Sequence, residues 1–293
     1  MMRGRQLLLM ATLMLASALV AMAPASGAAP SCGAAVSKAN GTSWVCRFAD
    51  EFNGSAIDGN KWVAQRTALS GLSGGEADCW VDSPNNISVA SGTLRLTSRK
   101  EAAPFMCDSP HGRYYTPYSS GSVSTRGKFV QTYGRWQIRA KFPNVKVTGS
   151  HSALWLYPRD HTYGDWPASG EIDIAEYFTR LPDRVIPVIH YNALGRSNRT
   201  LTNKKCLVAD AWNFHTYTAE WTTSTIRIWI DSKLCVNHTI NARGVLTGAA
   251  PFDQPFVTYL TQSLGVGQNR FRDGRNPTPL PLRTEVDWVH VWS

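Results

Sequence analysis

The chain has 293 residues, of which 30 are basic and 21 acidic, so it carries a formal net charge of +9. The basic residues are scattered along the sequence rather than gathered into a block, and this gives little support to a nucleic-acid-binding role. The same diffuse charge could attract acidic polysaccharides or an anionic wall, or could serve only solubility.

The N-terminus has the order of a secretory signal peptide. Arg3 and Arg5 precede an apolar stretch from Leu7 to Ala23, and small residues follow it. This stretch is shorter than the roughly 20 apolar residues of a membrane-spanning helix, and no later segment is apolar enough to span a bilayer. We therefore predict that residues 1–28 are a signal peptide and that residues 29–293 form one secreted domain, with no membrane contact after cleavage and a monomeric state.

The six cysteines form an even set, as expected for an exported chain stapled by disulfides. Six cysteines allow 15 connectivities, and the sequence does not choose among them. Nearest-neighbour pairing closes loops of modest length, and it gives Cys32 with Cys46, Cys79 with Cys107, and Cys206 with Cys235.

Strand patterns recur along the chain, and helix patterns are nearly absent after the signal peptide. In chain order, we predict a hairpin made by 87–89 and 94–97, and alternating strands at 135–142, 226–230 and 286–292. Gly-, Pro- and Ser-rich stretches are expected to be loops: 70–75, 102–118, 143–150, 159–169, 192–210 and 270–281. Without repeats or a linker, this pattern indicates an all-β sandwich with a cleft between rim loops.

The segment Glu171-Ile172-Asp173-Ile174-Ala175-Glu176 places three carboxylates in a run otherwise made of Ile and Ala. Side chains alternate between the faces of a strand, so Glu171 and Asp173 share a face and Glu176 is out of phase with them. One extra residue, a β-bulge at Ile174-Ala175, would bring Glu176 to the same face, and bulges are common beside active sites. A surface charge run or a cation site is the simpler alternative, which the interleaved Ile residues disfavour.

The spacing of this trio suits a retaining glycosidase. At roughly 3.3 Å per residue, Glu171 and Glu176 have backbones on the order of 15 Å apart, so leaning side chains could bring the carboxyls to about 5–6 Å. A retaining enzyme needs its nucleophile and acid/base about 5–5.5 Å apart. Asp173 lies between them, where it could bond one Glu and raise the pKa of Glu176 by keeping like charges crowded.

These motifs, in their order, resemble glycoside hydrolase family 16, in the laminarinase-like branch whose active-site strand carries a bulge. The resemblance rests on Asp50–Gly54, Tyr133–Arg135, Trp155–Pro158, Tyr163–Gly170, Glu171–Glu176, Val188–Tyr191 and Glu285–Val289. It implies a concanavalin-type jelly roll of two antiparallel sheets, with Glu171 as nucleophile, Asp173 as helper and Glu176 as acid/base. The implied reaction is endo-hydrolysis of β-1,3- or β-1,4-linked glucans or galactans with retention, which needs no cofactor.

Further substrate-binding candidates surround the trio. Because sugars pack their C–H faces on aromatic rings, Trp166 and then Trp155 are the best subsite candidates, whereas Trp136, Trp229, Trp288 and Trp292 are assigned mainly to the core. The resemblance adds four positions to the cleft: Trp80, Asn86, His190 and Gln262. The alternative for His190 is a buried histidine bonded to backbone, and Arg135 could equally reach substrate or lie on a strand surface.

The resemblance also implies a structural, non-catalytic calcium ion, held partly by Asp287 and a carbonyl near Gly92. The chain contains no dense oxygen-ligand motif of its own.

Three functions follow as alternatives. The first is a retaining endo-β-glucanase that acts on β-1,3-linked or mixed-linkage glucan. The second is a galactan hydrolase acting on agarose or carrageenan, and the third is a carbohydrate-binding sandwich without turnover. The intact trio argues against the third, because a binding module has no need of crowded carboxylates.

Overall fold

The computed structural model describes residues 30–72, 77–193, 201–244 and 246–293, and the predicted signal peptide therefore lies outside the described residues. In these ranges the chain is almost entirely β, as predicted. The strands are β1 (Cys46–Asp50), β2 (Val63–Ala64), β3 (Cys79–Trp80), β4 (Ile87–Ala90), β5 (Thr93–Ser109), β6 (Gly112–Ser124), β7 (Gly134–Lys141), β8 (Ser150–Pro158), β9 (Glu171–Phe178), β10 (Ile186–His190), β11 (His215–Trp221), β12 (Thr225–Ile230), β13 (Lys233–Thr239), β14 (Phe256–Leu264) and β15 (Leu282–Trp292), with a short helix α1 (Thr67–Ser70) and a 3₁₀ turn η1 (Gly267–Asn269).

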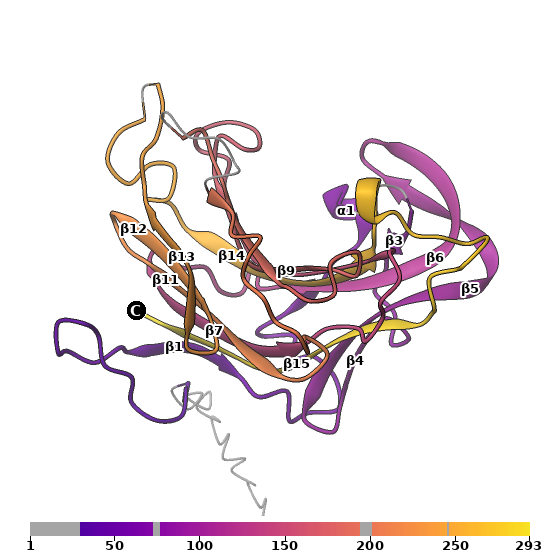
Figure 1. Ribbon diagram of the computed structural model, residues 1–293, viewed down its shortest axis with the longest axis horizontal. Coiled ribbons are helices and arrows are strands. Elements are labelled where there is room, and N and C mark those ends of the chain that lie inside the picture. Colours follow the sequence, from indigo (N-terminus) through magenta and orange to yellow (C-terminus); the bar gives the residue numbers. More distant parts are fainter. Residues whose placement is uncertain (1–29, 73–76, 194–200, 245) are drawn as a thin grey trace, which may run out of the picture.

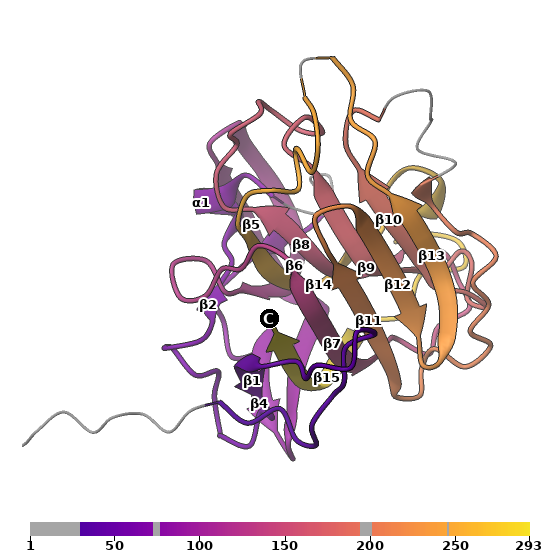
Figure 2. The same cartoon turned by 90° about the vertical axis from the view of Figure 1, so that its left-hand side faces the viewer.

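The strands form two curved, mainly antiparallel layers, which is the predicted jelly-roll sandwich (Figure 1). The inner sheet has the order β10-β9-β8-β14-β6, and the outer sheet has the order β5-β15-β7-β11-β12-β13. The long strands β5 and β6 pair with each other and link the two layers. Figure 1 shows that the inner sheet turns a concave open face away from the outer sheet, and Figure 2 shows its strands side by side.

The hydrophobic core lies between the layers and follows from strand alternation. Leu154 and Leu156 of β8 and Trp136 and Ile138 of β7 belong to one core cluster, and all four are fully buried. Trp136 stacks on Trp221 with ring centroids 5.7 Å apart, so its assignment to the core is confirmed. Residues between the core positions of β8 point to the open face, where they are available to a substrate.

Trp292 is also buried, at 3 % exposed, as predicted, but two of the four tryptophans assigned to the core lie elsewhere. Trp229 and Trp288 are only half-buried. The cause in β15 is a register shift at Asp287, which turns Val289 inward in place of Trp288. Trp229 alternates with the buried isoleucines of β12 and therefore points outward.

The predicted loop at 102–118 is wrong, because all of these residues except the turn at Pro110 and His111 belong to β5 and β6. The pairing shifts register between Lys100 and Phe105, and this irregularity contains Pro104, which cannot donate to a ladder. The disulfide between Cys79 and Cys107 ties this hairpin to β3.

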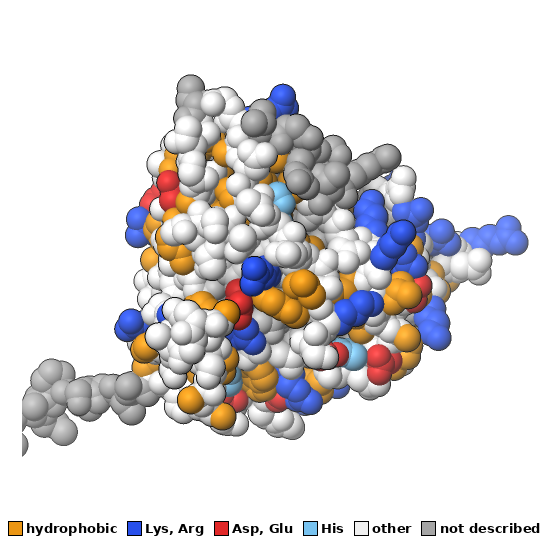
Figure 3. All heavy atoms as spheres, turned by 60° about the vertical axis from the view of Figure 1, so that its left-hand side comes forward, with side chains coloured by type: hydrophobic (Ala, Val, Ile, Leu, Met, Phe, Trp, Pro, Cys, Tyr) orange, Lys and Arg blue, Asp and Glu red, His pale blue; other side chains and the backbone are white. Residues whose placement is uncertain are grey.

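The three predicted disulfides are all confirmed, joining Cys32 to Cys46, Cys79 to Cys107 and Cys206 to Cys235. Among the described residues, no helix has the length and apolar character needed to cross a membrane. Lys and Arg side chains are spread over several parts of the face in Figure 3, in keeping with the diffuse charge of the sequence.

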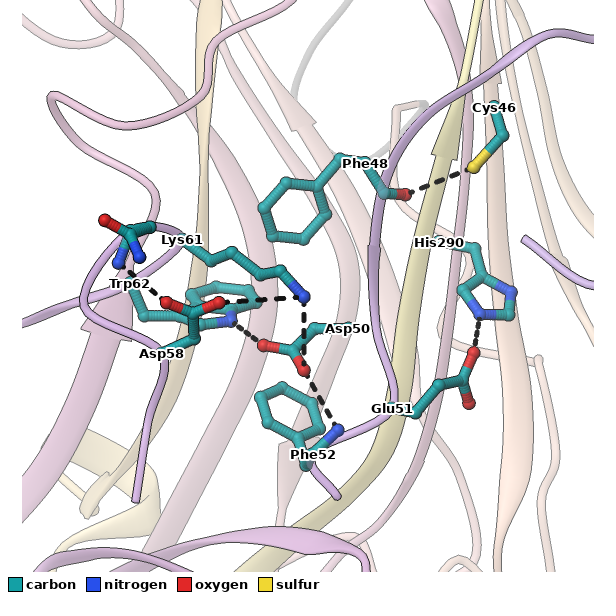
Figure 4. A network of polar contacts seen from close by, with 10 residues as sticks. Cys46, Phe48, Asp50, Glu51, Phe52, Asp58, Lys61, Trp62 and His290 are labelled. Carbon is teal, nitrogen blue, oxygen red and sulfur yellow. Dashed lines mark hydrogen bonds and ion pairs between the residues drawn. The ribbon is translucent and has the colours of Figure 1, made fainter. Parts of the chain in front are cut away.

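The segment that follows β1 is anchored by polar contacts (Figure 4). Asp50 accepts hydrogen bonds from the Trp62 indole at 2.7 Å and from the Phe52 amide at 3.0 Å, while Glu51 turns the other way and contacts His290 at 2.5 Å. The Asp50–Gly54 motif therefore fastens the N-terminal segment to β15 and contributes to the fold.

Candidate active site

The predicted bulge is present in β9. Asp173 pairs with Trp155 of β8 and Glu176 pairs with Ala153, so two residues of β9, Ile174 and Ala175, stand opposite one residue of β8. The register to β10 shifts at the same point. As a result, Ile172, Ile174, Ala175 and Tyr177 are fully buried in the core, and the three carboxylates share the open face of the inner sheet.

Each carboxylate of the trio contacts one ring nitrogen from a different element. The Trp166 indole N–H donates to Glu171 Oε2 at 2.5 Å from the loop before β9. His190 Nε2 on β10 lies 3.3 Å from Asp173 Oδ2. The remaining carboxylate, Glu176, has its Oε1 2.9 Å from Nε2 of a β8 residue, His151.

The trio is electrostatically crowded. Burial, followed by repulsion from Asp173, raises the pKa of Glu171 from 4.5 to about 8, against the opposing effects of His190 and the Trp166 hydrogen bond. Burial, followed by repulsion from Glu176, raises the pKa of Asp173 well above its ordinary value. A proton held by Asp173 removes one of the charges that oppose ionisation of Glu171, so the cluster can keep Asp173 neutral while Glu171 ionises.

This raised pKa predicts that Glu171→Gln stabilises the protein at neutral pH. The folded state holds a proton on Glu171 up to about pH 8, whereas the unfolded chain releases it near pH 4.5, so stability falls as the pH rises between these values. Allowing for partial exposure of the side chain, the substitution should raise the free energy of unfolding by on the order of 2 kcal/mol at pH 7. Thermal unfolding at pH 7 and pH 4 checks this, and an equal effect at both pH values would contradict it.

The aromatic residues near the trio divide by exposure. Trp166 is 53 % exposed and its ring lies 5.3 Å from that of His190, so it can present a face to a sugar. Trp155 stacks on Tyr259 at 4.5 Å and is 7 % exposed, and Trp80 is 5 % exposed. Trp155, Trp80 and Tyr259 share one apolar cluster at the open face, so the structure brings both predicted tryptophans to the floor beside the carboxylates.

A pocket of about 380 Å³ opens beside Glu176, lined by residues of the paired strands β9 and β10 and of the segments 202–204 and 266–269. Its walls include Phe178, Ile186, Val188 and His190, and Glu176 lies at its edge. The acid/base candidate therefore borders a concave space that can receive one end of a substrate.

Three predicted substrate contacts are engaged in contacts within the protein. Gln262 is fully buried between the sheets, where its amide accepts from Ser152 and Thr284 at 2.9 and 2.8 Å. Arg135 lies on the outer sheet and pairs with Glu220. Asn86 is 1 % exposed and its amide donates to the Thr97 carbonyl at 3.0 Å and to the Ser119 hydroxyl at 2.9 Å. These three residues are corrected to structural roles.

His151 is the site residue that sequence reasoning missed. It precedes Ala153 and Trp155 by two and four residues in one strand, so all three side chains point to the open face. The sequence spacing indicates that His151 shares a face with Trp155. Only the pairing of β8 with β9, however, shows that His151 reaches Glu176.

The calcium prediction does not fit the residues at Asp287. Arg139 donates to this carboxylate on the outer sheet, so its charge is already neutralised by a guanidinium group. Calcium needs several oxygen ligands with unneutralised charge, and neither Asp287 nor Gly92 is assigned to a metal here.

The curved sandwich and the bulged carboxylate strand define a glycoside hydrolase. The family model of glycosyl hydrolases family 16 matches residues 75–289, and the chain belongs to this family. It is 34 % identical over 261 residues to glucan endo-1,3-beta-glucosidase A1 of Niallia circulans, covering 83 % of this chain and 37 % of that protein. It is 32 % identical over 257 residues to the beta-glucanase of Rhodothermus marinus, covering 85 % of each.

The fold agrees with a solved structure of the same family. A mutant of the non-specific endo-beta-1,3(4)-glucanase SCLam, co-crystallised with an oligosaccharide, superposes with a TM-score of 0.70 and is 28 % identical. The alignment covers 85 % of this chain and 95 % of that one.

Proposed function

We propose that this chain is a secreted retaining endo-β-glucanase that hydrolyses β-1,3-linked glucan, including mixed-linkage glucan. The observation that carries the proposal is the bulge, which sets Glu171, Asp173 and Glu176 on one open face beside the exposed Trp166 and an apolar cluster of Trp80, Trp155 and Tyr259. The endo-1,3-glucanase and beta-glucanase relatives support this choice of polysaccharide. Three disulfides support export to an oxidising compartment.

The proposed mechanism is double displacement. Glu171 attacks the anomeric carbon while Glu176 protonates the leaving oxygen, and a covalent glycosyl-enzyme forms. Glu176 then takes a proton from water, the water oxygen attacks the same carbon, and Glu171 leaves. Trp166 holds Glu171 Oε2, which orients the carboxylate for attack by its other oxygen. Because the pKa of Glu171 is raised to about 8, the ionised form that attacks is the minor fraction at neutral pH, and a proton held by Asp173 lowers the repulsion that opposes this ionisation.

The test is a substrate panel with product stereochemistry. Purified protein is incubated with laminarin, mixed-linkage glucan, agarose and carrageenan, and the new reducing ends are followed by proton NMR early in the reaction. We expect shorter oligosaccharides from laminarin, released first as the β-anomer. Release of the α-anomer would contradict retention, cleavage of agarose or carrageenan alone would favour the galactan hydrolase, and binding without products would favour a binding module.

A further inference from the structure

His151 occupies a fixed position beside Glu176. It lies on β8, in the middle of the inner sheet, where its backbone pairs with β9 on one side and with β14 on the other. Its ring stacks on Phe178 with centroids 4.6 Å apart and planes 10° apart. This stacking fixes the plane of the imidazole, and Nε2 comes within 2.9 Å of Glu176 Oε1.

The contact is held in a largely enclosed place. The side chains of His151 and Glu176 are 29 % and 18 % exposed, so water competes little for the hydrogen bond. One face of the imidazole is covered by Phe178, and its Nε2 edge is aimed at the carboxyl. If His151 served only to fill space, an aromatic ring without the Nε2 atom would be sufficient at this position.

We propose that His151 is a positioning residue for Glu176, donating from Nε2–H to Oε1 so that the catalytic proton resides on Oε2. This inference rests on the proposed function, in which Glu176 is the acid/base. The bond holds the carboxyl in one plane and directs its second oxygen toward the leaving group. After the proton moves to the leaving oxygen, the same N–H stabilises the carboxylate that remains.

Two substitutions of His151 test this positioning role. His151→Phe keeps a ring against Phe178 and removes the donor, whereas His151→Gln places an amide N–H near the position of Nε2. We expect His151→Phe to lower kcat on the polysaccharide by about 10- to 100-fold, as for other groups that orient a catalytic side chain, with KM changed less than about 3-fold. His151→Gln should recover most of that loss.

The dependence of activity on the leaving group distinguishes a positioning role from a structural one. A purely structural defect would lower activity equally on both kinds of substrate. With a 2,4-dinitrophenyl β-laminaribioside, the phenolate departs without protonation, so kcat/KM of His151→Phe should stay within about 3-fold of the wild type. Both variants are first compared with the wild type by circular dichroism and thermal unfolding. The polysaccharide used is whichever member of the panel the wild type cleaves.

The outcomes separate this inference from the proposed function. A wild type inactive on laminarin contradicts the choice of polysaccharide and leaves the ratio between variants to be measured on another substrate. Equal losses on polysaccharide and aryl glycoside, unchanged kcat in His151→Phe, or absence of rescue in folded His151→Gln would each overturn the positioning role. Selective loss on the polysaccharide with rescue by Gln supports it.

Discussion

Glu171→Gln is expected to abolish hydrolysis, with kcat on laminarin reduced by at least about 10⁴-fold. An amide cannot attack the anomeric carbon as a carboxylate does, yet it has the same shape and can still accept the hydrogen bond from Trp166. Folding should therefore be retained. This variant is also predicted to be more stable than the wild type at neutral pH. Loss of activity together with this gain in stability would show that the catalytic group, and not the fold, has been lost.

Azide rescue gives this prediction its stereochemical test. A Glu171→Ala variant leaves space on the nucleophile's side, so azide should attack an activated β-glycoside there and yield an α-glycosyl azide. Glu220→Gln, which changes a carboxylate of the outer sheet, is the matched control and should keep wild-type turnover. Turnover of Glu171→Gln near the wild-type rate, or a β-glycosyl azide from Glu171→Ala, would remove Glu171 from the nucleophile's role.

Two bulges in this chain differ in how far a sequence can reveal them. In β9, regular alternation would send Glu176 into the core, and the cost of burying a charge makes the bulge predictable. In β15, the shift at Asp287 exchanges Val289 for Trp288 on the core face, and both are acceptable there. The sequence therefore reveals only the bulge in β9, where regular alternation would bury a charged residue.

The misplaced Gln262 shows a second limit of the sequence. Every residue of β14 is buried, so burial does not alternate and the sequence cannot assign the two faces. Partners in the other layer decide the outcome, because Gln262 meets Thr284 of β15 inside the sandwich. Arg135 lies in a perfectly alternating strand, but alternation does not state which sheet the strand joins.

Separation along the chain explains why the three carboxylates could be predicted and His151 could not. The three carboxylates lie within six residues of one strand, so local geometry determines their common face. The partner of Glu176 lies 25 residues away and depends on the pairing of β8 with β9. His190, whose neighbourhood the family resemblance indicated, is placed opposite Glu171 by the pairing of β10 with β9.

The acid/base assignment makes the second large prediction. Glu176→Ala is expected to lower kcat/KM on laminarin by about 10³-fold, because a sugar alkoxide leaves poorly without a proton. On a 2,4-dinitrophenyl glycoside the same variant should keep kcat/KM within about 10-fold. Its kcat should fall further, since water now attacks the glycosyl-enzyme without a general base. Azide should restore kcat and yield the β-glycosyl azide, opposite in configuration to the product of Glu171→Ala.

Asp173 is the rival for this role, and the same measurements decide between them. Its pKa is raised well above the ordinary value, so it also carries a proton that could be donated. However, Asp173 contacts His190, is only 4 % exposed, and lies beside the nucleophile, whereas Glu176 borders the pocket lined by residues of β9 and β10. If Asp173→Asn showed the dependence on leaving group and Glu176→Ala lost activity equally on both substrates, the acid would be Asp173. The reverse pattern assigns proton transfer to Glu176 and leaves Asp173 to control the charge on Glu171.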